Sequence, residues 1–173
     1  MPPSIYAPLY IYDMRIRPIL PQDNAQVQHI IQHTILEYGA PKKGTAYSDI
    51  ATTQMYEHYQ KPRRAYWVIE SDAGLVGCGG IGPLEDFDHR YCELQKMYFL
   101  PVARGKGLGK RLIELCLAFA KAYQFKFMYL ETMSNMIEAQ GLYKRMGFTL
   151  LDKPLGNTGH FSCPVQMLKP LHD

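Results

Sequence analysis

A short segment that combines alternating glycines with basic residues carries the strongest chemical signal in the sequence. It reads ELQKMYFLPVARGKGLG and spans residues 93–109. A strand is expected to end at Pro101, and a helix is expected to begin among the glycines. Glycine lets the backbone approach a phosphate closely, and the first N–H groups of a helix point toward such an anion. Positive charge is added by Arg104, Lys106, Lys110 and Arg111.

Two common phosphate-binding loops do not fit this spacing. A Walker A loop needs G-x-x-x-x-G-K-[ST], but Lys110 is followed by Arg111, which offers no hydroxyl for magnesium. A dinucleotide fingerprint needs G-x-G-x-x-G, whereas the glycines here follow G-x-G-x-G and Lys110 occupies the last position of that fingerprint. The segment therefore predicts an anion site of another kind.

Two motifs in this region resemble those of the GNAT superfamily of N-acetyltransferases. The family's central pattern, Arg/Gln-x-x-Gly-x-Gly/Ala, corresponds to residues 104–109, and its downstream pattern, Ala-x-x-Leu-Tyr-x-x-x-Gly-Phe, corresponds to residues 139–148. They occur in the family's order, separated by one expected helix and one expected strand. The resemblance runs from about Met14 to the end of the chain. It implies an α/β fold in which a central mixed sheet, splayed near its middle, is flanked by helices on both faces.

The resemblance also implies acetyl-CoA as the co-substrate. In the family the glycine loop holds the pyrophosphate, and the preceding strand pairs with the pantetheine arm, here with the Met97 N–H facing the thioester carbonyl. Many relatives place an Asn three to four residues before the motif's Ala. Met136 stands at that position, so Asn135 beside it is expected to substitute. The expected coenzyme-binding residues are Met97, Tyr98, Phe99, Arg104, Gly105, Lys106, Gly107, Leu108, Gly109, Lys110 and Asn135.

Acyl transfer from a thioester needs a neutral amine, so one group must accept a proton and another should protonate the departing thiolate. The resemblance offers Glu93, on the strand that leads to the loop, as the base and Tyr143 of the downstream motif as the acid. Strict alternation would put Glu93 on the same strand face as Met97 and Phe99, although a bulge, common in the family, would shift that register. The structural alternatives are a carboxylate paired at the sheet surface and an aromatic packed between helix and sheet.

Acceptor-binding residues are expected in two places. The loop between the last two strands carries Asn157, Thr158 and His160, which would contact the acceptor or help to deprotonate it. Turn chemistry accounts equally well for a loop of this composition. Glu37 and Tyr38, at the end of the first helix, could also line the acceptor pocket.

No metal site, nucleic-acid site or membrane segment is expected. His29 and His33 are spaced i, i+4, but neither an H-E-x-x-H pattern nor a third ligand accompanies them. The formal net charge is only +3, and the basic cluster follows the glycine loop rather than base-stacking aromatic residues. The basic pairs at 42–43 and 63–64 are interpreted as solvated loop charge. No apolar run approaches the roughly 20 residues of a membrane span.

The length of 173 residues predicts one domain, residues 14–173, preceded by an N-terminal arm, residues 1–13, that is extended or added to a sheet edge. The arm lacks a basic region and a cleavage site, so no signal peptide is expected. The four cysteines contain no C-x-x-C pair and three lie in apolar stretches, which favours reduced core residues in a cytoplasmic protein. An exposed edge strand could pair in a homodimer.

Hydrophobic periodicity and turn residues predict the order of the elements. Strands are expected at 14–19, 65–70, 75–81, 91–100, 125–131, 148–152 and 161–168. Helices are expected from Asp23 or Asn24 to Tyr38, from Ser48 or Asp49 to Tyr59, and at 107–123 and 136–146.

The predicted function is direct transfer of an acetyl group from acetyl-CoA to a primary amine of a small molecule or peptide in a ternary complex. The first alternative is a non-catalytic acyl-CoA-binding or sensor domain that keeps the phosphate loop. The second is a basic module that contacts RNA or DNA. The acceptor is not specified, because a fold says little about which amine is used.

Overall fold

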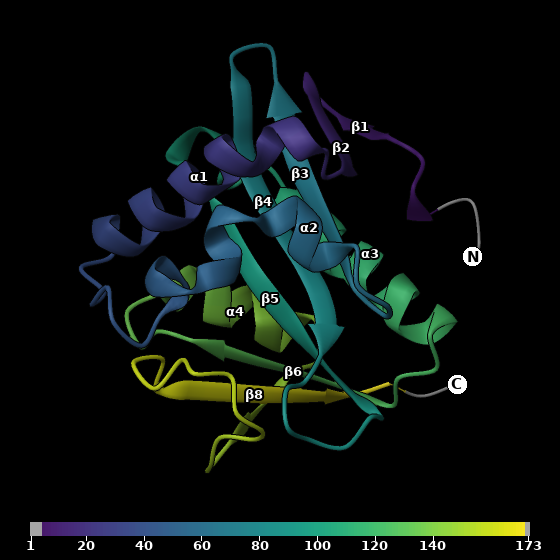
Figure 1. The fold of residues 1–173 in the computed structure, drawn as a ribbon, viewed down its shortest axis with the longest axis vertical. Coiled ribbons are helices and arrows are strands. Elements are labelled where there is room, and N and C mark those ends of the chain that lie inside the picture. Colours follow the sequence, from purple (N-terminus) through teal and green to yellow (C-terminus); the bar gives the residue numbers. More distant parts are fainter. Residues whose placement is uncertain (1–4, 172–173) are drawn as a thin grey trace.

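One eight-stranded sheet forms the centre of the molecule (Figure 1), as seen in a computed structural model that describes residues 5–171. Its strands are β1 (Leu9–Ile11), β2 (Met14–Pro18), β3 (Ala65–Ser71), β4 (Gly74–Pro83), β5 (Tyr91–Phe99), β6 (Phe127–Thr132), β7 (Thr149–Leu151) and β8 (Val165–Pro170). The spatial order is β1-β2-β3-β4-β5-β6-β8-β7. Neighbouring strands are antiparallel, except that β5 and β6 run parallel. The predicted mixed α/β sheet is confirmed.

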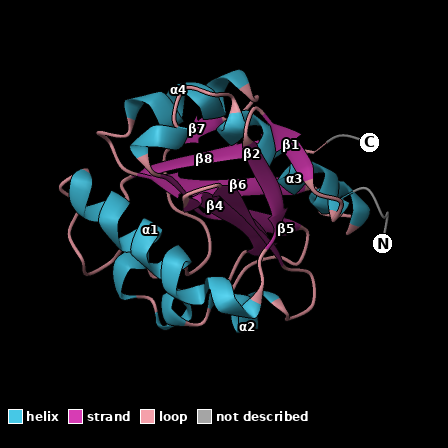
Figure 2. Cartoon of the chain, turned by 90° about the horizontal axis from the view of Figure 1, so that it is seen from above, coloured by secondary structure: helices cyan, strands magenta, loops and turns pink. Residues whose placement is uncertain are grey.

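Helices cover both faces of this sheet (Figure 2) and divide the apolar core into two parts. One face carries α1 (Asn24–Glu37) and α2 (Met55–Tyr59), whose buried residues form one cluster with β3 and β4. The other face carries α3 (Leu108–Ala122) and α4 (Ile137–Arg145), whose buried residues join the larger cluster. The two faces of β5 therefore look toward different sets of helices.

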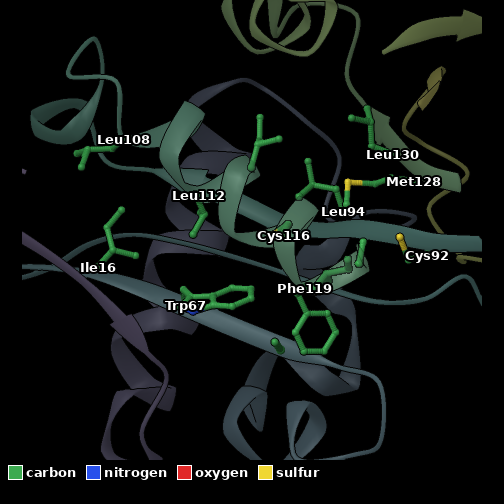
Figure 3. Packing of buried hydrophobic residues seen from close by; sticks show 14 of the residues in the cluster. Ile16, Trp67, Cys92, Leu94, Leu108, Leu112, Cys116, Phe119, Met128 and Leu130 are labelled. Atoms are coloured by element: carbon green, nitrogen blue, oxygen red, sulfur yellow. The ribbon is translucent and has the colours of Figure 1, made fainter. Parts of the chain in front are cut away.

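The larger core fixes the direction of α3. Spacings of four and three residues put Leu108, Leu112, Cys116 and Phe119 on one face of this helix, and all four are buried. They pack on the sheet beside Trp67, whose ring meets that of Phe119 edge to face at a centroid distance of 6.2 Å (Figure 3). Because the apolar stripe runs the length of the helix, the N-terminus of α3 is held at the end of β5.

The prediction of the second helix is wrong for the first half of that segment. Residues 46–53 form two short 3-10 turns, Ala46–Ser48 and Ile50–Thr53, with Asp49 between them in an extended conformation. Asp49 does not cap a helix with its side chain, because its carboxylate binds Lys96 and His160 instead. Only the last five residues of the segment, α2, are α-helical.

The N-terminal segment adds a strand to the edge of the sheet, one of the two arrangements expected for it. β1 pairs with β2 as an antiparallel hairpin. Ile5 is buried, and its carbonyl oxygen accepts a hydrogen bond of 3.2 Å from Trp67 Nε1. Residues 1–4 of the predicted arm lie outside the described residues, and the division at residue 13 stays a prediction.

The last strand begins later than predicted, at Val165 rather than Phe161. The preceding residues turn, since the Cys163 N–H donates to the His160 carbonyl at 2.9 Å. All four cysteines are free and buried, whereas only three of them were expected in the core. Within residues 5–171, no helix has the length and apolar character that crossing a membrane requires.

Candidate active site

A cleft opens where strands β5 and β6 diverge. The two strands pair only between Tyr91–Glu93 and Phe127–Tyr129, and they diverge beyond that point. A cavity of about 740 Å³ occupies the gap, lined by residues 94 and 96–99 of β5 and residues 130–132 of β6. This divergence confirms the predicted splay of the sheet, and it leaves the β6-facing edge of the second half of β5 without a strand partner.

The glycine loop closes one end of this cavity. Gly105 and Gly107 have φ values of 71° and 75°, and Gly107 is the N-cap residue of α3. A Cβ atom at either position would meet nothing within 4 Å, so these residues are required by backbone conformation and not by packing. The first N–H groups of α3 have no partners within the helix and lie at its positive end. The loop has the geometry of an anion site.

Arg104 fastens the loop to the end of α1. Its two terminal nitrogens donate to the two carboxylate oxygens of Glu37 at 2.7 Å each, and its Nε donates to the Phe99 carbonyl at 3.0 Å. The hydrogen bond from Arg104 lowers the pKa of Glu37. Glu37 does not line the cavity, whereas Tyr38 beside it does, and the place of both in an acceptor pocket stays a prediction.

Two predicted coenzyme contacts lie away from the cavity. Asn135 donates from Nδ2 to the Tyr38 carbonyl at 2.6 Å, and its neighbour Met136 lines the cavity in its place. The coenzyme contact expected of Asn135 stays a prediction. Lys106 lies in a second, shallow pocket of about 430 Å³ beside the β1–β2 hairpin, whereas Lys110 borders both pockets.

A bulge in β5 overturns the predicted alternation. Lys96 adopts a φ of 49°, and two residues of β5, Lys96 and Met97, stand opposite one residue of β4. Met97 and Phe99 pack with the core on the α3 side, whereas Gln95 accepts a hydrogen bond from Tyr59 of α2 on the other side. Glu93 therefore does not share a face with Met97 and Phe99.

Glu93 sits at the point where the two strands diverge, and it lines the cavity. Only 5% of its surface is exposed. The Tyr59 hydroxyl donates to Gln95 Oε1, and Gln95 Nε2 donates to Glu93 Oε2, each at 2.8 Å. Burial raises the pKa of Glu93, and the hydrogen bond from Gln95 opposes this only in part. A carboxylate with a raised pKa accepts a proton more readily than an ordinary one.

Tyr143 lies in the cavity wall on the α4 side. It is buried, and its ring meets that of Phe148 at a centroid distance of 6.0 Å. Burial raises the pKa of the Tyr143 hydroxyl well above its usual value near 10. The phenol therefore stays protonated at neutral pH and can donate to a developing thiolate.

The loop before β8 reaches the cavity through His160, and Thr158 contacts the cavity residue Glu131. Thr158 Oγ1 donates to Glu131 Oε2 at 2.7 Å, and His160 Nε2 donates to Asp49 Oδ2 at 2.8 Å. His160 lines the cavity. Asn157 does not, since its side chain donates to Asp86 at 3.2 Å, and its acceptor role stays a prediction.

Asp49 is a component that the sequence analysis missed. Its Oδ2 binds both His160 and Lys96. Burial would raise the pKa of Asp49, but the hydrogen bond from His160 and the charge of Lys96 outweigh that effect and lower it to about 2. Asp49 therefore holds a full negative charge between two basic side chains of the cavity wall.

Three side chains could together supply ligands to a metal ion. Ligand atoms of Glu93, Glu131 and His160 lie within 4.8 Å of one another. Each of them already has a protein hydrogen-bond partner. The pair singled out by spacing, His29 and His33, stacks ring on ring at 5.5 Å instead. The absence of a metal stays a prediction.

Comparisons with known proteins agree with this architecture. A family model described as the acetyltransferase (GNAT) family matches residues 30–148. The uncharacterized N-acetyltransferase YjgM of Escherichia coli K12 is 44% identical over 151 residues, which cover 87% of this chain and 90% of that protein.

Solved structures share the fold at lower identity. An acetyltransferase of the GNAT family from Staphylococcus aureus Mu50 superimposes with a TM-score of 0.79 at 18% identity, covering 92% of this chain and 99% of that one. The acetyltransferase yncA from Salmonella typhimurium, solved with its cofactor acetyl-CoA, gives a TM-score of 0.73 at 23% identity, covering 92% and 95%.

Proposed function

The chain belongs to the GNAT family of acetyltransferases, and on that premise we propose that it transfers an acetyl group from acetyl-CoA to a primary amine by direct attack in a ternary complex. The observation that carries the proposal is a single cavity that joins the glycine loop to Glu93 and Tyr143. A related fold, yncA, was solved with acetyl-CoA. The presence of a base and an acid in the cavity favours an enzyme over a sensor domain.

The donor end of the cavity suits a long, anionic thioester. In the proposal the backbone amides of the loop, residues 104–109, and the side chain of Lys110 take the diphosphate. The pantetheine arm lies along residues 97–99 of β5, whose β6-facing edge has no strand partner. The Met97 N–H then donates to the thioester carbonyl and stabilises the oxyanion that forms on it.

The proposed chemistry forms one C–N bond and breaks one C–S bond. A lysine-like amine is only about 0.1% neutral near pH 7.4, so its proton must be removed before attack. Glu93 accepts that proton, directly or through water, and the neutral nitrogen attacks the thioester carbon. The C–S electron pair leaves with the sulfur, which takes a proton from Tyr143 and departs as free CoA. The second proton of the attacking nitrogen returns to Tyr143, directly or through water, and Glu93 releases its proton to solvent.

Cys163 supports direct transfer over an acyl-enzyme. It lines the cavity, but burial raises the pKa of its thiol to about 12. A thiol with such a pKa is protonated at neutral pH and is a poor nucleophile. The chemistry of this wall therefore favours attack by the amine itself.

The kinetic pattern tests the proposed function. Free thiol release is measured with a panel of primary amines while acetyl-CoA is varied at several fixed acceptor concentrations. Direct transfer in a ternary complex is expected to give intersecting double-reciprocal lines, whereas parallel lines would indicate a covalent intermediate. A protein that binds acetyl-CoA in a calorimeter but releases no thiol with any amine would support the sensor alternative.

The acid side of the pH–rate profile should report Glu93. The base works only when ionised, so turnover is expected to fall as the pH falls through its pKa. Because burial raises that pKa, the midpoint of this fall is expected above the ordinary carboxyl value of 4.5. The measurement is kcat against pH for the native protein and for Asp72→Asn, an exposed carboxylate on the β3–β4 turn that should not matter. A midpoint at or below 4.5 would contradict the assignment.

A further inference from the structure

The part of the cavity beyond the thioester position is acidic. Glu93 is six residues before Phe99 on β5, about 20 Å away at the rise of an extended strand. Around Glu93 lie Glu131 of β6 and His160 of the loop before β8, with ligand atoms within 4.8 Å of one another. This group, the acceptor wall, is the surface that an incoming amine meets.

Glu131 forms no ion pair among the described residues. Its two oxygens accept hydrogen bonds from two neutral hydroxyls, Tyr129 and Thr158, each at 2.7 Å. Neutral donors fix the orientation of the carboxylate without cancelling its charge. A cation that enters the acceptor wall therefore gains an electrostatic attraction that a neutral or anionic group does not.

The basic side chains of this wall are already engaged. Lys96 and His160 both line the cavity, and both bind the same carboxylate, that of Asp49. Only 9% of the Lys96 side chain is exposed, so it cannot turn outward to solvent. The other basic residues of the lining, Arg104, Lys110 and Arg145, belong to the phosphate loop, α3 and α4. A carboxylate on the acceptor would find no free cation here among the described residues.

A buried hydroxyl without a hydrogen-bond partner in the described part of the chain also indicates that the cavity holds a ligand. Thr34 of α1 lines the cavity and is 3% exposed. Its Oγ1 atom has no hydrogen-bond partner among the described residues. An unsatisfied buried hydroxyl costs free energy, so a polar group of a bound molecule is the natural partner. The cavity is thus built to hold a ligand.

We propose that the acceptor is a primary amine with no carboxylate on the carbon that bears the nitrogen, such as a decarboxylated amino acid or a diamine. The inference rests on the proposed acetyltransfer and narrows its substrate class. An α-amino acid would bring its carboxylate beside Glu93 and Glu131 and leave it without a partner. Buried like charges that lack a counter-ion are disfavoured.

Matched pairs of acceptors test this inference. Tyramine is compared with tyrosine, histamine with histidine and agmatine with arginine, through kcat/KM for thiol release from acetyl-CoA. The amine of at least one pair is expected to exceed its amino acid by about tenfold or more, which corresponds to about 1.4 kcal/mol. Equal or better use of the amino acids across the pairs would overturn the inference.

A Glu131 variant tests whether this carboxylate causes the preference for amines over amino acids. Glu131→Gln keeps the shape of the side chain and removes its charge, so kcat/KM for the preferred amine is expected to fall about tenfold while the Kd of acetyl-CoA stays unchanged. Asp72→Asn, an exposed change of the same charge far along the chain, is the control and should leave both values unchanged. An amine preference that survives Glu131→Gln undiminished would contradict the role of this wall.

A binding measurement separates failure of this inference from failure of the proposed function. Each amine and amino acid is titrated into the protein saturated with CoA, so that no turnover is needed. Heat from amines and not from amino acids supports the inference, and the reverse, or no heat from any amine at millimolar concentration, overturns it. Absence of heat with acetyl-CoA itself would instead sink the proposed function.

Discussion

Replacing Glu93 by Gln is expected to lower kcat by about 10²–10⁴-fold, the usual cost of losing a general base. The amide keeps the size of the side chain and its place beside Gln95, but it cannot take a proton from an ammonium group. The Kd of acetyl-CoA should stay within about twofold, because the carboxylate lies on the opposite face of β5 from Met97 and Phe99. Thiol release and calorimetry on the same preparation measure the two quantities.

A matched carboxylate provides the control for that experiment. Glu138 also lines the cavity, from the first turn of α4, and Glu138→Gln is expected to leave kcat unchanged. Tyr143→Phe should lower kcat by a smaller factor, since water can still protonate a thiolate. If Glu93→Gln retains the native rate, the base must be sought elsewhere, and His160 held by Asp49 is the group that the geometry offers.

Replacing Gly107 by Val is expected to weaken acetyl-CoA binding by on the order of 10- to 100-fold. Gly107 has a φ of 75°, where a residue with a Cβ atom loses about 1–2 kcal/mol. The added side chain would also stand in the open space in front of the α3 N-terminus, where nothing lies within 4 Å. Two effects should therefore weaken acetyl-CoA binding: the strain in the backbone and the steric block to an approaching phosphate.

Gly39→Val separates these two causes. Gly39 has a φ of 67° and also has nothing within 4 Å of its would-be Cβ, but it follows α1 and does not line the cavity. Urea unfolding is expected to show a similar loss of stability for both variants. Calorimetry is expected to show a weakened Kd for Gly107→Val alone. Equal Kd values in the two variants would show that the loop is not part of the acetyl-CoA binding site.

Local sequence pattern was enough for the fold and for the glycine loop at the start of α3. The glycine spacing and the apolar stripe of α3 are properties of one short segment, so the loop and the helix behind it could be predicted together. Glu93 and Tyr143, which the family resemblance singled out, both line the cavity, and their catalytic roles stay predictions. What those motifs do not encode is the bulge at Lys96, which reverses the faces of β5.

The acceptor half depends on contacts between distant segments. Asp49 meets Lys96 across 47 residues and His160 across 111, and no spacing rule links them. Asp49 was instead expected to cap a helix, since an Asp ahead of an apolar segment favours that role. Glu37 was expected to face the acceptor, but Arg104, 67 residues away, binds both of its oxygens. Long-range pairing decided each case.

The bulge in β5 turns the residues before and after Lys96 to different sides of the sheet, and this separation could be exploited. Past Lys96 the side chains of Met97 and Phe99 face the α3 side of the sheet, while Glu93 and Gln95 face the other side. In the proposed function, substitutions that change amine binding can therefore accumulate on one side of β5 without weakening the binding of the acyl donor. Evolution, or a protein engineer, can change what is acetylated and keep the source of the acetyl group constant.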